Sequence, residues 1–217
     1  MIDLHTHTTF SDGELIPSEL ARRAEAVGYR GLAITDHVDF SNIDFVVPRI
    51  VKIAARLAEA SELKIVPGVE ITHVPPALIS EIVKGARELG ARLVVVHGET
   101  IVEPVIPGTN LAAIEAGADI LAHPGLISEA QVRMAAEKSV YLEITARKGH
   151  SLTNGWVAKL ALKCNASLVL NTDSHAPGDL INSEYARRVA AGAGLSEEVI
   201  AVMFANSEAI LKRALQR

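Results

Sequence analysis

The segment Asp3-Leu4-His5-Thr6-His7-Thr8 lies at the start of the chain, and Asn171-Thr172-Asp173-Ser174-His175 lies near its end. Each segment joins an apolar run typical of a β-strand to two metal-binding side chains that are two residues apart. Side chains at positions i and i+2 of a strand point to the same side, so each pair offers two donors to one place. Ligands contributed from both ends of the chain indicate a closed fold around a metal site.

Between these segments, apolar runs alternate with stretches that carry apolar residues at helical spacing. The runs predict strands at Ile2–His5, Gly31–Thr35, Lys64–Val69, Leu93–His97, Ile120–His123, Val140–Ile144 and Leu168–Asn171. The other stretches predict helices at Pro17–Val27, Val47–Ala60, Pro75–Leu89, Leu111–Ala116, Ser128–Lys138, Asn154–Lys163, Ser183–Ala193, Ser196–Phe204 and Ser207–Leu215. Repeated βα units with short connections predict a parallel sheet with right-handed crossovers.

The positions of the polar residues distinguish a closed barrel from an open sheet. Candidate ligands lie at or just after the ends of nearly all the predicted strands: His5, His7, Asp12, His37, Glu70, His97, His123, Asp173 and His175. In an open sheet these ends would spread along a line at about 4.8 Å per strand, whereas a barrel gathers them at one mouth. The sequence therefore predicts an α/β fold, a seven-stranded TIM-like (β/α) barrel in a single domain over residues 1–217.

Composition excludes several classes of protein. Hydrophobic residues make up 49% of the 217 residues, which excludes disorder, and the formal net charge of −5 argues against a long nucleic acid as partner. No apolar stretch is long enough to span a membrane, and the first ten residues lack the features of a signal peptide. The single cysteine, Cys164, cannot form an internal disulfide, which favours a cytoplasmic protein.

The recurrence of histidine at equivalent places indicates metal binding. A single histidine at a strand end is usually structural, but six of the eight histidines follow this pattern together with three carboxylates. Nine donors exceed the needs of one ion and suit two or three. Mixed imidazole and carboxylate ligation allows zinc, manganese or iron, and the absence of cysteine argues against a purely structural zinc site.

Counting charges predicts the kind of substrate. Three divalent ions and three carboxylates leave the pocket about three units positive, so it should bind an anion such as a phosphate monoester. The ions would polarise the phosphoryl oxygens and activate a bound water. The expected nucleophile is a metal-bound hydroxide held by Glu70 and Asp173. His150 is a candidate proton donor to the leaving group, and a surface role for it is equally compatible with the sequence.

Several motifs together resemble the PHP (polymerase and histidinol phosphatase) superfamily. They are Asp3–Thr8 with Ser11-Asp12-Gly13, Ile34-Thr35-Asp36-His37, Pro67-Gly68-Val69-Glu70, His97-Gly98, Ala122-His123-Pro124-Gly125 and Asn171–His175. The resemblance covers Ile2 to about Pro177 and implies a distorted seven-stranded βα barrel with a trinuclear metal site. It also implies phosphoesterase activity, with histidinol-phosphate phosphatase as the best-known member that acts on a small molecule.

The resemblance also implies how the ligands are shared among three ions. The first ion would be held by His5, His7, Glu70 and Asp173; the second by Glu70, His97 and His123; the third by Asp12, His37 and His175. Glu70 would therefore bridge two ions. Some relatives carry histidine at the position of Asp12, so the third site can differ in affinity or in metal.

Loops that follow the strands offer candidate substrate-binding residues. Arg147 and Lys148 follow the sixth strand, and Arg147 has the better geometry for phosphate oxygens. Glu99 and Thr100 follow His97, and His73 lies three residues after Glu70. Each of these residues could equally be a solvated loop residue. Deeper in the barrel, Asp3 shares a face with His5 and could orient a ligand imidazole.

We therefore expect a hydrolase that acts on phosphoric esters, most simply a phosphomonoesterase specific for a small metabolite. A nucleotide or oligonucleotide phosphoesterase, or an exonuclease, on the same site is the first alternative. Hydrolysis of an amide or lactone in a related barrel is the second, and a barrel that binds metal or a partner without catalysis is the third. The sequence indicates neither the physiological substrate nor the oligomeric state.

Overall fold

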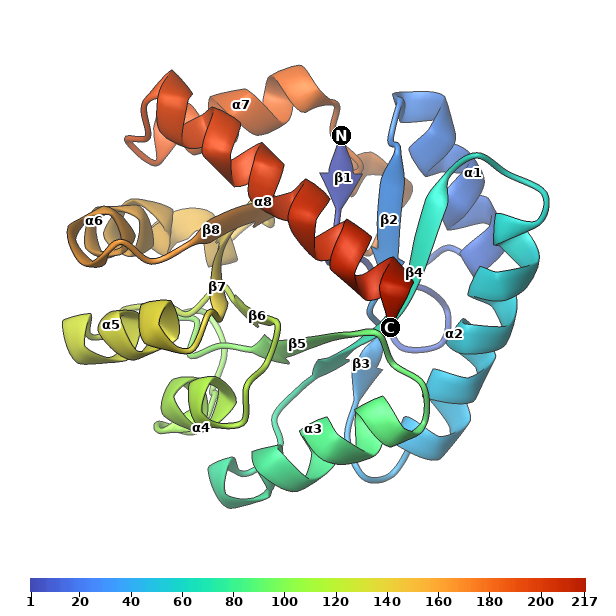
Figure 1. Cartoon of the computed structure of the whole chain (residues 1–217), viewed down its shortest axis with the longest axis horizontal. Coiled ribbons are helices and arrows are strands. Elements are labelled where there is room, and N and C mark those ends of the chain that lie inside the picture. The colour runs from blue at the N-terminus through green and yellow to red at the C-terminus, as the bar shows by residue number, and fades with distance from the viewer.

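The computed structural model describes residues 1–217 and shows a nearly closed barrel of parallel strands surrounded by helices (Figure 1). The strands are β1 Ile2–Asp3, β2 Gly31–Ile34, β3 His37–Val38, β4 Lys64–Ile71, β5 Leu93–His97, β6 Ile120–Ala122, β7 Tyr141–Thr145 and β8 Leu168–Asn171. The helices are α1 Pro17–Val27, α2 Ile43–Ala58, α3 Ile79–Glu88, α4 Thr109–Glu115, α5 Glu129–Glu137, α6 Asn154–Cys164, α7 Ser183–Gly192 and α8 Glu197–Gln216. None of these helices combines the length and the apolar character that a membrane crossing requires.

The strands pair in parallel in the order β1-β2-β4-β5-β6-β7-β8, and β3 pairs with the second half of β4. Since β2 pairs with the first half of β4, β2 and β3 form one interrupted strand. A parallel bridge between Thr6 and Ser174 closes the ring, and the N–H of His7 donates to the Ser174 carbonyl at 2.9 Å. The predicted seven-stranded βα barrel is confirmed.

Local sequence signals explain where most of the helices begin and end. α1 begins at Pro17, whose missing N–H needs no partner in the first turn. Ser128 and Gln131 form a capping box at the start of α5. Left-handed residues follow the ends of several helices, with Gly28 at φ 93° and Asn165 at φ 53°.

Three predicted helix boundaries are wrong. The helix predicted at Pro75–Leu89 begins with a 3-10 turn at Pro76–Leu78, and α3 itself starts at Ile79. α2 begins at Ile43 rather than Val47, because Val46 and Val47 pack with Ile50 on its buried face and Pro48 lies inside the helix. The two helices predicted after Ser196 form the single helix α8. Asn206 and Ser207 do not break it, because Asn206 donates to the Leu168 carbonyl at 2.9 Å and Ser207 donates to the Met203 carbonyl at 3.4 Å.

Two apolar clusters hold the barrel together. The larger, of 45 buried residues, lies between the strands and the surrounding helices. The smaller, of 12 buried residues, fills the N-terminal half of the barrel and includes Ile210, Leu211 and Ala214 of α8, which crosses the ring of strands in Figure 1. A Cβ at Gly31 would lie 2.5 Å from Leu211 Cδ2, so glycine allows α8 to approach β2 closely. Because this cluster fills the N-terminal end of the barrel, a polar site can lie only at the opposite, C-terminal end of the strands.

Replacing Ile210 by alanine should lower the free energy of unfolding by about 2 to 5 kcal/mol, because it opens a cavity in the closed end of the barrel. Val202→Ala on the same helix is the matched control, since Val202 is 59% exposed and its replacement should cost less than about 0.5 kcal/mol. Urea unfolding of the metal-free protein measures both variants. Equal destabilisation by the two would show that α8 does not seal the barrel.

Candidate metal centre

The mouth of the barrel contains a cavity of about 470 Å³ whose fifteen lining residues include only one hydrophobic side chain, Val38. The others are Ser11, Asp12, His37, Asp39, Ser41, Asn42, Thr72, His73, His97, Glu103, Arg147, His150, Asp173 and His175. They come from the C-terminal ends of the strands and from the segments that follow them, as expected for parallel strands in a barrel. The cavity is therefore polar and opens over the C-terminal ends of the strands.

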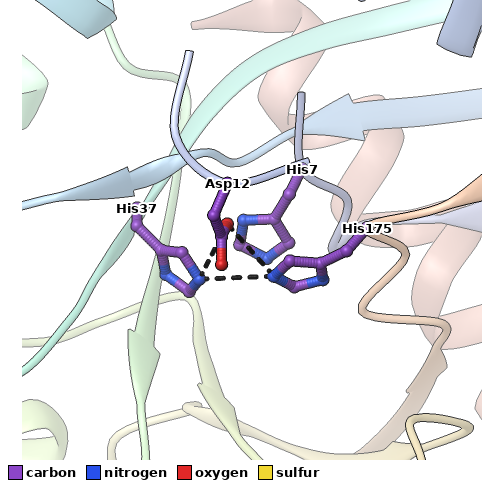
Figure 2. A group of neighbouring side chains, drawn as sticks. All are labelled: His7, Asp12, His37 and His175. Atoms are coloured by element: carbon purple, nitrogen blue, oxygen red, sulfur yellow. Dashed lines mark hydrogen bonds and ion pairs between the residues drawn. The ribbon is translucent and has the colours of Figure 1, made fainter. Parts of the chain in front are cut away.

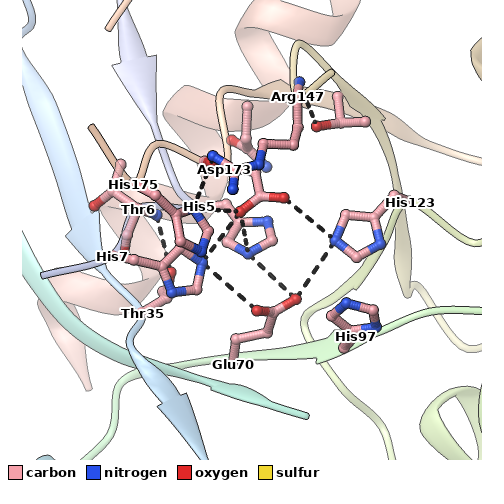
Figure 3. Close-up of polar contacts among 12 residues, drawn as sticks. His5, Thr6, His7, Thr35, Glu70, His97, His123, Arg147, Asp173 and His175 are labelled. Carbon is pink, nitrogen blue, oxygen red and sulfur yellow. Dashed lines mark hydrogen bonds and ion pairs between the residues drawn. The ribbon is translucent and has the colours of Figure 1, made fainter. Parts of the chain in front are cut away.

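Two buried carboxylates, Glu70 and Asp173, lie at the centre of the site (Figure 3). Glu70 Oε1 lies 3.3 Å from His5 Nε2 and 3.6 Å from His123 Nε2. Asp173 Oδ1 lies 3.2 Å from His7 Nε2, and its Oδ2 lies 3.5 Å from His123 Nε2. The ligand pairs from the two ends of the chain therefore meet, as predicted from their spacing.

A second group lies nearer the surface and consists of His7, Asp12, His37 and His175 (Figure 2). Asp12 Oδ1 is 3.2 Å from His175 Nε2 and 3.5 Å from His37 Nε2, and the two imidazole nitrogens are 3.4 Å apart. The adjacent Gly13 packs directly on the backbone of His7, where a Cβ would lie 2.6 Å from the carbonyl group. Glycine therefore brings Asp12 to the other ligands.

The structure brings all nine predicted ligands into overlapping groups. Four sets of donor atoms lie within 4.8 Å of one another: His7, Asp12, His37 and His175; His5, His123 and Asp173; His5, His7 and Glu70; and Glu70, His97 and His123. The last set has the membership expected for the second ion. The set around Asp12 also contains His7, which the resemblance to the PHP superfamily assigned to the first ion.

Unpaired buried atoms show that these residues suit a metal. Buried side-chain polar atoms normally have hydrogen-bond partners. Most of the buried side-chain atoms that lack a hydrogen-bond partner lie in this site: His5 Nε2, His7 Nδ1 and Nε2, both oxygens of Glu70, both ring nitrogens of His123, and Asp173 Oδ1. One other such atom, Tyr29 Oη, lies away from the site. Mixed imidazole and carboxylate donors are the ligands of zinc, manganese and iron, so the donor set fits such ions.

In several of the ligand histidines, the Nδ1 atom of the imidazole contacts a neighbouring oxygen. His5 Nδ1 lies 2.9 Å from Glu143 Oε1, and His97 Nδ1 lies 3.1 Å from the Gly98 carbonyl. His175 Nδ1 lies 2.9 Å from the Asp173 carbonyl. Such contacts fix the tautomer and leave the Nε2 lone pair for a metal.

The backbone is strained at two of these residues. His123 has φ 26° and Asp173 has φ 53°. These values lie in the left-handed region, which residues other than glycine rarely adopt. Strain of this kind is kept where a site requires a particular orientation, and it costs of order 1–3 kcal/mol per residue. Both side chains point into the centre of the site in Figure 3.

Burial and mutual charge shift the pKa values of the central groups in opposite directions. Although burial lowers the pKa of His5, three neighbouring carboxylates raise it well above the usual value. Burial raises the pKa of Asp173 to about 7. Burial and neighbouring imidazoles lower the pKa of His7 and of His123 well below the usual value. In the metal-free site these shifts favour the protonated forms of His5 and Asp173 and the neutral forms of His7 and His123.

The predicted substrate-binding residues have different placements. Arg147 and His73 line the cavity, and Arg147 Nη1 lies 3.2 Å from Asp179 Oδ2. Lys148 is exposed and does not line the cavity. Glu99 faces away, because its Oε1 accepts from the N–H groups of Gly108 and Asn110 at the start of α4. Lys148 and Glu99 therefore both lie outside the cavity lining.

Three further residues act through contacts that the sequence did not indicate. His150 lines the cavity, and its Nδ1 lies 3.0 Å from Thr100 Oγ1, so Thr100 contacts His150 rather than the cavity. Burial lowers the pKa of His150 below its usual value. Asp3 accepts from Thr172 Oγ1 at 2.6 Å and from the His5 backbone N–H, so it holds the main chain and not a ligand imidazole.

Sequence reasoning missed two carboxylates, Glu143 and Glu103. Glu143 is fully buried, and its Oε2 also accepts from the His123 N–H at 3.1 Å. Its position in the apolar run Tyr141–Thr145 was a signal, because an isolated glutamate in a buried strand requires partners. Glu103 lies 3.1 Å from His97 Nε2, and no periodicity in its loop marks it.

Comparisons with known proteins were made for the sequence and for the fold. The family model of the PHP domain matches residues 3–95. An uncharacterized protein of Methanocaldococcus jannaschii is 48% identical over 198 residues, which cover 90% of this chain and 91% of that relative. A 5'-3' exoribonuclease of Haemophilus influenzae is 41% identical over 70 residues, which cover 32% of this chain and 23% of that relative.

The fold is similar to that of a histidinol phosphate phosphatase from Lactococcus lactis, solved in complex with zinc, L-histidinol and phosphate. The TM-score is 0.63 with 19% sequence identity, and the match covers 90% of this chain and 94% of that one. At this identity the likeness concerns the fold, and it agrees with the distorted TIM-like barrel described above.

Glu143→Gln should weaken zinc binding by about 10- to 100-fold, because the amide no longer provides a charged partner for His5 Nδ1. The isosteric change keeps the volume of the buried side chain. Glu137→Gln, at an exposed position of α5, is the control and should bind as the wild type does. Competition with a chelating dye measures the affinities, and an unchanged value for Glu143→Gln would contradict this role.

Zinc binding at pH 7 should release at least about one proton per chain, because His5 and Asp173 have raised pKa values and must lose their protons to act as ligands. The sign follows from the raised values: affinity should rise with pH through about 7 and fall below it. Calorimetry in buffers of different ionisation enthalpy measures the protons released. A binding enthalpy independent of the buffer would refute the expectation.

Proposed function

Because the chain belongs to the PHP domain family, we propose that it is a metal-dependent hydrolase of phosphate esters and that its substrate is a phosphate monoester of a small metabolite. The observation that carries the proposal is the set of buried donor atoms without hydrogen-bond partners at the mouth of the barrel. These atoms belong to five residues that the fold gathers from both ends and from the middle of the chain: His5, His7, Glu70, His123 and Asp173.

Charge favours an anionic substrate. Asp12, Glu70 and Asp173 are the carboxylates among the nine ligands, and two or three divalent ions would exceed their charge. The guanidinium of Arg147 also lines the cavity, where its planar fork suits phosphate oxygens. The site would therefore attract a phosphate group, although the whole chain has a formal charge of −5.

The size of the cavity favours a small molecule. A volume of about 470 Å³ lies in the range of sites that hold metabolites. Its walls beyond the ligands are mostly polar and include Ser41, Asn42, Thr72 and Glu103. An alcohol moiety with hydroxyl or amino groups fits these walls better than an aliphatic one.

The residues of the chain would position the reactants. When bound, divalent ions would polarise the phosphoryl oxygens and lower the pKa of a bound water. Glu70 and Asp173 would hold ions at the buried centre of the site, while Asp12, His37 and His175 would hold one among the more exposed residues. Arg147 would orient the phosphate, and burial of the central residues would exclude bulk water.

A second candidate is a phosphoesterase that acts on nucleotides or short oligonucleotides. The similarity to the 5'-3' exoribonuclease over 70 residues favours it. The acidic net charge and the aromatic content of 4% favour a short substrate over a long nucleic acid. The same cavity would then bind the terminal phosphate.

The test is a screen of metal-reconstituted protein against phosphate monoesters, nucleotides and phosphodiesters, including short oligonucleotides. We expect release of inorganic phosphate from small monoesters. His7→Ala should reduce kcat by more than about 100-fold, since His7 belongs to two ligand groups. Arg22→Ala, which removes a side chain 76% exposed on α1, should have no effect.

The outcomes separate the candidates. Turnover of diesters or oligonucleotides without turnover of small monoesters would select the second candidate. Absence of turnover of every ester by protein with bound metal would contradict both. Activity that survives in His7→Ala would show that the reaction does not use the metal centre.

A further inference from the structure

Glu103 lies at the edge of the cavity among three imidazoles. It comes from the loop between β5 and α4, and its side chain is 36% exposed. Its Oε2 lies 3.1 Å from His97 Nε2 and 3.4 Å from His73 Nε2, and its Oε1 lies 3.3 Å from His150 Nε2. No motif of the ligand set includes this carboxylate.

The distance between Glu103 and His97 matches the distances between the other ligands. Two donors that share a tetrahedral zinc ion at about 2.1 Å lie about 3.4 Å apart. His5 and Glu70 are separated by 3.3 Å, His7 and Asp173 by 3.2 Å, and His175 and Asp12 by 3.2 Å. We propose that Glu103 is an additional metal ligand, which shares an ion with His97. This inference rests on the metal centre of the proposed function.

The orientation of His97 supports this assignment. Its Nδ1 faces the Gly98 carbonyl at 3.1 Å, so Nε2 presents its lone pair. His97 forms no contact within 4.0 Å with Glu70, and the carboxylate nearest its Nε2 belongs to Glu103. The ion at this site would otherwise have only the carboxylate of Glu70, which is shared with a neighbouring ion.

His150 is the positioning residue for Glu103. Its Nδ1 faces Thr100 Oγ1 at 3.0 Å, and its Nε2 faces the Glu103 oxygen that points away from His97. The chain of contacts from Thr100 through His150 to Glu103 fixes the carboxylate in the same way that Glu143 fixes His5. A fourth carboxylate lowers the charge of a site with three ions from about +3 to about +2, which matches a phosphate dianion.

The experiment compares Glu103→Gln with Glu99→Gln. Glu99 lies in the same loop, and glutamine there can still accept from the N–H groups that its carboxylate now binds. Metal-free protein is titrated with Zn²⁺ in competition with a chelating dye, and far-UV circular dichroism checks the folding of each variant. We expect one zinc ion to bind at least about 10-fold more weakly in Glu103→Gln, and Glu99→Gln to behave as the wild type.

His150 variants test the positioning role. His150→Gln keeps a donor toward Glu103 and should bind zinc more tightly than His150→Ala, whereas a purely structural role would not separate the two by their metal affinity. A structure of the zinc-loaded wild type provides a test that needs no variant. We expect a Glu103 oxygen at about 2.0–2.2 Å from an ion.

Equal zinc affinities for Glu103→Gln and the wild type, or a Glu103 carboxylate remote from every ion, would overturn the inference. Its failure is distinct from that of the proposed function. Wild-type protein that hydrolyses phosphate esters while Glu103→Gln binds zinc normally would refute only the role of Glu103. Zinc binding that depends on Glu103 without hydrolysis of any ester would refute only the proposed reaction.

Discussion

The parallel bridge between Thr6 and Ser174 joins the two ends of the βα repeat and closes the barrel. The residues on either side of it, His5, His7, Asp173 and His175, then lie in one place, although they come from opposite ends of the chain. Parallel pairing also requires that all the strands end at the same mouth. Glu70, His97 and His123 therefore reach the same site from the middle of the chain.

This closure places many polar atoms in the interior without hydrogen-bond partners. Burial of unpaired polar groups destabilises a protein, and the left-handed backbone at His123 and Asp173 adds strain. The apolar cluster sealed by α8 and the larger cluster under the outer helices offset these costs. The fold thus holds its donors apart from solvent and ready for cations, and cations would relieve the unpaired charge. Glu143 and Glu103 extend this arrangement on two sides of the site.

Much of this arrangement could be predicted from the sequence, because it follows periodic patterns. Spacing at i and i+2 predicted that His5 and His7 act together, and apolar periodicity predicted the strands. Loop conformation follows no such period. Glu99 and Glu103 lie in one loop, yet Glu99 binds the start of α4 and Glu103 faces the imidazoles. Only the fold distinguishes these two carboxylates. The helix starts predicted at Val47 and Ser207 were wrong for a similar reason, since packing outweighed local propensity there.

The central claim is that the nine side chains at the barrel mouth converge on a cluster of cations. Native mass spectrometry of the protein, reconstituted with zinc or manganese and then freed of excess metal, counts the ions that each chain retains. We expect two or three ions per chain, and fewer when His7 is replaced by alanine. A chain that retains no ion, or the same number with and without His7, would contradict the claim.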